Sequence, residues 1–178
     1  ARPKEVLTFT VAELFQKYCD FKFTPQTTEN ELKELANKLN VDVKSATTID
    51  DYFYLIFMEK IENQWPPDRL VFVEKYPPYQ AALARLDQSG WGDRFEAYWN
   101  GLELANAFHE LNDPEIQRAR SQDDLNKKKQ MGKEEIGLDE SFFTALAQGM
   151  PPSSGIALGI ERLYMALKNI KNIDQIRS

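Results

Sequence analysis

An Asn-Gly pair at residues 100–101 limits the possible folds of this chain more than any other feature. Residues 94–99 and 102–106 flank the pair, and both runs carry the apolar and aromatic side chains that are typical of strands. Asn-Gly between two such runs is the usual sequence of a two-residue hairpin turn, because both turn positions need positive φ angles. The sequence therefore predicts an antiparallel hairpin over residues 94–107.

The register expected from this turn places two carboxylates on one face of the hairpin. If the Asn-Gly pair forms the whole loop, Tyr98 lies opposite Glu103, and by the same count Ala97 lies opposite Leu104. Glu96 then shares a face with Glu103 and lies diagonal to it. Nearby like charges oppose ionisation, so a divalent ion or a substrate ammonium would relieve the pair. The alternative is that Glu103 is a solvated side chain on the outer face of the sheet.

A second stretch, Gly155 to Arg162, predicts a strand followed by a helix. Two prolines, 151 and 152, bar a helix immediately before it, whereas apolar residues follow at helical spacing from Ile160 onward. Arg162 then lies in the first helical turn, where the helix dipole opposes a cation. Glu161 would offset this charge in a structural interpretation. In a functional one, the planar guanidinium meets a nucleotide base or phosphate oxygens.

The remaining pattern indicates an α+β fold with strands and helices segregated along the chain. Residues 1–66 are expected to form a helical subdomain or insertion, and residues 67–178 the remainder of an antiparallel sheet with its helices. Asp113 is a plausible N-cap for a helix that starts at Pro114, with Gly132 as its terminator. The further expected elements are helices at 10–19, 28–40, 48–64 and 138–148, the last packing through Phe142, Phe143 and Leu146, and a strand at 70–73.

Charge and composition exclude several classes of protein. A net charge of −6 argues against nucleic-acid binding, which normally needs a basic patch. Cys19 is the single cysteine, so the chain holds no internal disulfide. His109 is the single histidine, and its apolar neighbours favour a structural hydrogen-bonding role. The sequence has no apolar run long enough to span a membrane and no signal peptide at its start, so we expect a cytoplasmic protein without membrane partners.

The order of these motifs resembles the end of the catalytic domain in class II lysyl-tRNA synthetases. It is most similar to their short paralogue, the elongation factor P lysyl-lysine ligases, which have alanine where Ala157 stands and the synthetases usually have glycine. Both families usually have glycine at position 107 and aspartate at 161, where this chain has Ala107 and Glu161. The matching segments are 76–84, 94–96, 100–101, 103–106, 108–111 and 155–162.

This resemblance implies a C-terminal part of a class II synthetase-type catalytic domain and a two-step reaction. ATP activates a lysine-type amino acid, expected to be β-lysine, as an aminoacyl adenylate, and the acyl group then passes to a lysine of elongation factor P. By position, the resemblance implies ATP contacts from Glu103, Leu104, Gly159 and Arg162, with Arg162 also catalytic. It implies Mg²⁺ ligands at Glu103 and Glu110, and substrate contacts from Glu110 and Ala157. The full-length enzyme is expected to be a homodimer.

Two signatures of class II enzymes, one for the dimer interface and one for ATP, are not found in this sequence. The resemblance therefore predicts a piece of a longer ligase that is inactive alone. Two alternatives stay open. A lysyl-tRNA synthetase would use lysine and tRNA, and an anticodon-binding domain in the full-length protein would indicate it. A non-catalytic synthetase-like module would bind an amino acid or a partner protein, and a full-length gene without ATP-binding signatures would indicate that.

Overall fold

The computed structural model describes residues 2–130, 132 and 137–176, whose strands form a five-stranded sheet in the order β1-β2-β3-β4-β5. Strand β1 runs parallel to β2, and the other neighbours are antiparallel. The predicted α+β class is therefore confirmed. The strands are β1 (Glu5–Thr10), β2 (Arg69–Tyr76), β3 (Gly92–Trp99), β4 (Leu102–His109) and β5 (Ser154–Leu158).

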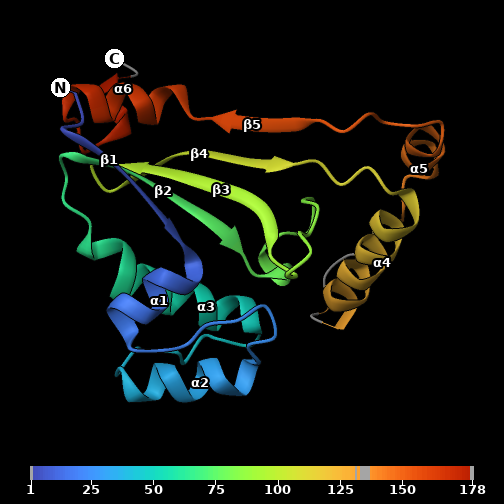
Figure 1. Ribbon diagram of the computed structural model, residues 1–178, viewed down its shortest axis with the longest axis horizontal. Coiled ribbons are helices and arrows are strands. Elements are labelled where there is room, and N and C mark those ends of the chain that lie inside the picture. Colours follow the sequence, from blue (N-terminus) through green and yellow to red (C-terminus); the bar gives the residue numbers. More distant parts are fainter. Residues whose placement is uncertain (1, 131, 133–136, 177–178) are drawn as a thin grey trace.

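Helices lie on both faces of this sheet and beyond one end of it (Figure 1). Helices α1 to α3 cover one face of β1 to β3, and their apolar side chains form a core with Val71, Val73 and Tyr98. Helix α6 packs on the other face, where Ala166 meets Trp99 and Leu104. The helices are α1 (Val11–Cys19), α2 (Glu29–Lys38), α3 (Ile49–Ile56), α4 (Pro114–Gln130), α5 (Glu140–Ala147) and α6 (Ile160–Lys168).

Capping boxes explain where the first three helices begin. Thr10, Thr28 and Thr48 are the N-caps of α1, α2 and α3, and each exchanges hydrogen bonds with the acidic residue three positions later. The predicted helices at 10–19 and 28–40 are confirmed to within two residues. The third begins as predicted, but its regular α-helical part ends at Ile56, followed by a π-helical turn (Phe57–Ile61) and a 3₁₀ turn (Glu62–Gln64).

Strand β1 was not predicted. It runs directly into α1, because Thr10 is both its last residue and the N-cap of the helix. No Gly, Pro or Asn therefore separates the two elements, and such residues are the usual sequence signal of a boundary. The division of the chain at residue 66 stays a prediction.

The hairpin forms as predicted, except for one bulge. Asn100 and Gly101 have φ angles of 55° and 71°, as this turn type requires. Tyr98 pairs with Glu103 as expected, but Ala97 pairs with Ala105 and not with Leu104, so that part of the predicted register is wrong. Leu104 is the extra residue, with its side chain buried against α6. A turn sequence does not reveal this bulge, because packing from a distant helix holds it.

The α4–α5 segment also matches its prediction, with one correction. Asp113 caps α4 by accepting hydrogen bonds from the backbone of residues 115 and 116 at 2.9 and 3.0 Å. Gly132 follows the helix with a φ of 68°, as a terminator does. In α5, Phe143 and Leu146 are buried as expected, but Phe142 is 48% exposed, so its predicted packing is wrong. A short helix buries only one stripe, and Phe142 lies about 100° around the helix from Phe143.

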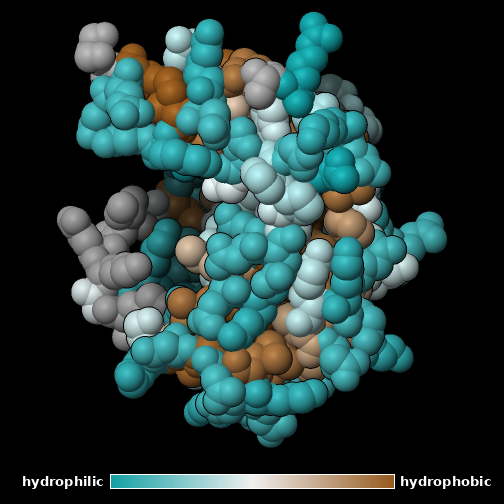
Figure 2. Space-filling view, turned by 90° about the vertical axis from the view of Figure 1, so that its left-hand side faces the viewer, coloured by the Kyte–Doolittle hydropathy of each residue, from teal (hydrophilic) through white to brown (hydrophobic). Residues whose placement is uncertain are grey.

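The surface is mostly polar on the face drawn in Figure 2, where apolar residues show in separate places between hydrophilic ones. On the edge strand β5, Ile156 and Leu158 are 63% and 47% exposed, and Ile160, the first residue of α6, is 65% exposed. An edge strand of this kind offers free backbone groups and apolar side chains to further chain. In the described part of the chain, no helix is long and apolar enough to cross a membrane.

Candidate active site

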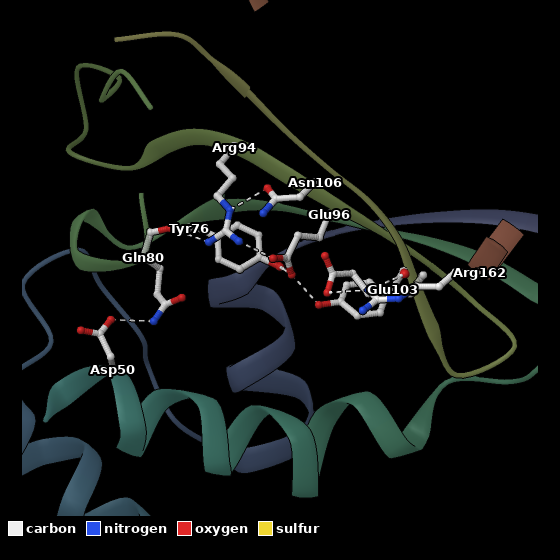
Figure 3. A network of polar contacts seen from close by, with 9 residues as sticks. Asp50, Tyr76, Gln80, Arg94, Glu96, Glu103, Asn106 and Arg162 are labelled. Carbon is white, nitrogen blue, oxygen red and sulfur yellow. Dashed lines mark hydrogen bonds and ion pairs between the residues drawn. The ribbon is translucent and has the colours of Figure 1, made fainter. Parts of the chain in front are cut away.

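The start of β4 and the first turn of α6 bring Glu103 and Arg162 together (Figure 3). The Nη1 atom of Arg162 donates a hydrogen bond to the backbone oxygen of Glu103 at 3.1 Å and lies 3.6 Å from its Oε2 atom. Arg162 lies in the first helical turn after a strand, as predicted. Its side chain is 54% exposed and that of Glu103 is 32% exposed. The pair is therefore open to solvent and to a ligand.

Glu103 is not a fully solvated side chain, and its charge is not fully matched. Burial raises the pKa of its carboxyl, the nearby Glu96 charge raises it further, and Arg162 and Arg94 lower it less than these two raise it. The predicted proximity of Glu96 and Glu103 is thus confirmed. A carboxylate held half-buried beside a like charge is stabilised by an additional cation.

Glu96 itself is only 3% exposed, and three groups stabilise its carboxylate. The hydroxyl groups of Tyr76 and Tyr98 donate to Oε2, and the Arg94 guanidinium forms an ion pair with Oε1 (Figure 3). A buried charge is tolerated when it is both paired and hydrogen-bonded in this way. Sequence reasoning placed Glu96 beside Glu103 but did not identify these partners.

Arg94 is the centre of the polar network. Its Nε atom donates to Oδ1 of Asn106 at 3.0 Å, Nη1 donates to the backbone oxygen of Gln80, and Nη2 meets Glu96. The guanidinium also lies 4.3 Å from the centre of the Tyr76 ring. Sequence reasoning missed Arg94 and Asn106 as site residues. The available signal was the Arg-x-Glu spacing, which puts both side chains on one face of a strand.

Two of the predicted ATP-binding residues meet through their backbones. The amide of Gly159, the N-cap of α6, donates to the backbone oxygen of Leu104 at 2.8 Å. Leu104 points its side chain into the cluster under α6, so only its backbone faces the site. A Cβ atom on Gly159 would lie 3.5 Å from the Arg162 side chain, an ordinary contact. The surrounding protein therefore leaves room for a side chain at this position.

The predicted substrate residues, Ala157 and Glu110, both lie at strand β5: Ala157 belongs to it, and Glu110, just beyond β4, packs against its Gly155. Ala157 pairs with Asn106, which pairs with Glu96 on the other side, so these three share one row and one face of the sheet. Glu110 follows β4, and a Cβ atom on Gly155 would collide with its Oε1 atom. The Glu110 carboxylate thus rests against a glycine two positions from Ala157.

The two predicted Mg²⁺ ligands are not brought together. Glu103 and Glu110 are seven positions apart on and just beyond β4, which places them on the order of 20 Å apart because a strand rises about 3.3 Å per residue. One ion therefore cannot bind both. Among residues 2–130, 132 and 137–176, no group of three or more His, Cys, Asp and Glu side chains is arranged to hold a metal. Mg²⁺ is often held by one or two carboxylates plus substrate phosphates, and Glu103 fits that arrangement.

A cavity of about 290 Å³ lies on the opposite face of the sheet and contains none of the predicted site residues. Glu74, Phe95 and Ala107 line it, and they alternate with residues of the site face. His109 also lines it, with Nε2 3.3 Å from Nη1 of Arg85 and Nδ1 3.9 Å from Oδ2 of Asp93. This geometry agrees with the structural role predicted for His109.

The chain matches a known protein family over nearly its whole length. A family model described as "tRNA synthetases class II (D, K and N)" matches residues 2–178. The chain belongs to the class II tRNA synthetase family. This class II chain is 36% identical over 99% of its length to an elongation factor P–(R)-β-lysine ligase of Haemophilus influenzae, of which the match covers 54%. A ligase of the same name from Hamiltonella defensa is 37% identical over 83% of the chain and 47% of that protein.

A lysine–tRNA ligase is also among the relatives of this class II chain. The enzyme of Thermoanaerobacter pseudethanolicus is 33% identical over 94% of the chain, and the match covers 34% of that enzyme. The predicted resemblance to lysyl-tRNA synthetases and their elongation factor P-modifying paralogues is confirmed. The chain spans about half the length of the ligases that it matches.

Proposed function

We propose that the full-length protein activates a lysine-type amino acid, with β-lysine preferred, as an aminoacyl adenylate, and transfers it to a lysine of elongation factor P. The observation that carries this proposal is the match of nearly the whole chain to a ligase named for elongation factor P and (R)-β-lysine. The site adds support, because Glu103 of β4 is paired with Arg162 of α6, and Glu96, Asn106 and Ala157 form one row across β3, β4 and β5.

Glu103 and Arg162 form the ATP end of this proposed site. Bound Mg²⁺ would supply charge neutralisation at the ATP phosphates, with Glu103 as its protein ligand. Arg162 uses one nitrogen to hold the Glu103 backbone, and its remaining donors are available for phosphate oxygens or its plane for the adenine. Leu104 and Gly159 border the nucleotide through their backbones. Adenylate formation needs positioning and charge neutralisation more than proton transfer.

Glu110 and Ala157 form the amino-acid end. The Glu110 carboxylate would pair with the substrate ammonium, a charge-assisted contact. The distance between Glu103 and Glu110 separates the two roles, so we assign Mg²⁺ to Glu103 and the ammonium to Glu110. Ala157, exposed on β5, adds one methyl group to the wall of the amino-acid pocket.

The rest of the active site is proposed to come from the half of the longer protein that this chain does not include. The chain alone is therefore expected to be inactive, and homodimerisation remains a prediction for the full-length enzyme. The specific alternative is a lysyl-tRNA synthetase, which the 33% identity to a lysine–tRNA ligase supports. That enzyme would charge tRNA with α-lysine.

Ala157→Gly in the full-length protein is expected to shift substrate preference toward α-lysine. Removing one methyl group opens a pocket wall, and a difference of this size changes selectivity by about tenfold. The measurement is amino-acid-dependent ATP–pyrophosphate exchange with (R)-β-lysine and with α-lysine, reported as the ratio of the two kcat/KM values. Ser154→Gly is the matched control, because Ser154 is on the same strand but on its other face.

An unchanged ratio in Ala157→Gly, or an equal shift in Ser154→Gly, would contradict the role given to Ala157.

Glu110→Gln is expected to depress the use of both amino acids, because it leaves the substrate ammonium without a counter-charge. If it spared one of the two, Glu110 would not be the general ammonium contact.

A further inference from the structure

A hydrogen bond outside the proposed site joins the helical layer to the loop that follows β2 (Figure 3). Asp50 lies in the first turn of α3, and Gln80 ends a 3₁₀ turn (Pro78–Gln80). The Nε2 atom of Gln80 donates to Oδ1 of Asp50 at 2.7 Å, across 30 positions of sequence. This contact fixes the loop relative to α3.

The same residue, Gln80, also contacts the centre of the site. Its backbone oxygen accepts a hydrogen bond from Nη1 of Arg94, while its backbone N–H donates to the backbone oxygen of Pro77 at 2.9 Å. The position of the carbonyl is therefore set on two sides. The turn holds the backbone, and Asp50 holds the side chain.

The position of the Gln80 carbonyl affects Glu96 and Asn106, because Arg94 contacts all three residues. The three nitrogens of Arg94 contact Gln80, Glu96 and Asn106, so each has a partner. A guanidinium is planar and presents its donors in a rigid fork. Displacing one acceptor therefore tilts the whole group away from the other two. Glu96 and Asn106 lie in the row that ends at Ala157.

Asp50 is not needed to cap its own helix. Thr48 and Asp51 do that through the capping box, in which the Oδ2 atom of Asp51 accepts from the backbone of Thr47 and Thr48 at 2.8 and 2.9 Å. Asp50 is instead partly buried, and this burial raises the pKa of its carboxyl. The Asp50 carboxylate is thus partly desolvated and not needed as a cap. We therefore assign it the role of holding the side-chain amide of Gln80.

We propose that Asp50 is a positioning residue for the ligase reaction: through Gln80 it fixes the carbonyl that orients Arg94, and thereby the Glu96 carboxylate and the Asn106 amide beside Ala157. This inference rests on the proposed function. In the proposed reaction, Asp50 contacts neither the amino-acid substrate nor ATP. The effect is one of alignment, and misplacement of a site group by about 1 Å can cost as much as 100-fold in rate.

The test uses the full-length protein with Asp50→Ala, Gln80→Ala and Asp50→Asn. The first two remove the contact and are expected to lower kcat/KM for (R)-β-lysine in ATP–pyrophosphate exchange by about tenfold. Asp50→Asn keeps an oxygen that accepts from Gln80, so it is expected to stay within about twofold of the wild type. The thermal midpoint should stay near the wild-type value in all three. Gln16→Ala is the matched control, because it removes an exposed amide–carboxylate contact of 3.2 Å to Asp20, within four positions at the end of α1, that joins α1 to no other element.

The outcomes separate the inference from the proposed function. Loss of activity in both alanine variants, with rescue in Asp50→Asn and no change in Gln16→Ala, supports the inference. Wild-type kcat/KM in Asp50→Ala would overturn it, and so would an equal loss in Asp50→Asn, which would show that charge and not position matters. A fall in activity that only follows a fall in folded protein would overturn it as well. If the wild type shows no lysine-dependent ATP–pyrophosphate exchange, the proposed function itself is overturned. If the wild type is active and all three variants exchange at the wild-type rate, only the role of Asp50 is overturned.

Discussion

Arg94→Met is expected to destabilise the chain by about 3–5 kcal/mol, because it leaves the Glu96 carboxylate buried without its cation. The two side chains are 12% and 4% exposed, so water cannot replace the lost partner. The measurement is the free energy of unfolding in urea. The double variant Arg94→Met/Glu96→Met is expected to be more stable than Arg94→Met alone, since no charge is then stranded.

Arg118→Met is the matched control for this prediction. Arg118 also pairs with a glutamate, Glu140, through two contacts of 2.7 and 2.6 Å, but that pair is exposed. Exposed ion pairs contribute little, because solvent compensates each charge. Equal effects of Arg94→Met and Arg118→Met would show that burial of Glu96 does not make its pairing essential.

Glu103→Gln in the full-length protein is expected to lower kcat/KM for Mg·ATP by about 100-fold, because charge stabilisation by a bound metal is worth several kcal/mol. Folding should change little, since the substitution relieves repulsion with Glu96. Pyrophosphate exchange at varied Mg²⁺ and ATP measures the effect. Glu161→Gln is the control, because Glu161 lies beside Arg162 on α6 and is exposed. Normal specific activity in a Glu103→Gln protein that unfolds easily would show that Glu103 is structural.

The pKa of Glu103 adds a pH dependence to the same prediction. Burial and Glu96 raise this pKa, so the proton stays bound to higher pH than on an ordinary glutamate. Protons then compete with Mg²⁺ as the pH falls toward that pKa. The Mg²⁺ concentration for half-maximal activity should therefore rise at lower pH in the wild type. Glu103→Gln should lose this dependence.

Local chemistry made the turn and the helix starts predictable from the sequence. Asn100 and Gly101 need no distant partner to specify a hairpin, and Asp113 caps α4 through its own backbone neighbours. Strand β1 and the bulge at Leu104 could not be predicted in this way. The first has no boundary residue before α1, and the second depends on packing against α6.

The site was predictable in its parts but not in its connections. The sequence placed Glu96 near Glu103 and put Arg162 in a first helical turn, and both follow from element geometry. Of the three groups that stabilise the Glu96 carboxylate, Arg94 and Tyr98 lie two positions from it on β3, whereas Tyr76 comes from β2. A single sequence does not show the strand pairing that brings Tyr76 to Glu96. The pairing of Glu103 with Glu110 as Mg²⁺ ligands came from resemblance alone, and the extended backbone between them separates the two carboxylates.

The most direct test of the proposed function is lysylation by the full-length protein with two acceptors in parallel. The enzyme is incubated with ATP and either (R)-β-lysine or α-lysine, together with elongation factor P or with lysine tRNA. Intact-protein mass spectrometry follows the factor, and aminoacylation follows the tRNA. We expect addition of β-lysine to elongation factor P, no charging of tRNA, and no reaction with the 178-residue chain alone. Efficient charging of tRNA with α-lysine and an unmodified elongation factor P would contradict it and identify a lysyl-tRNA synthetase.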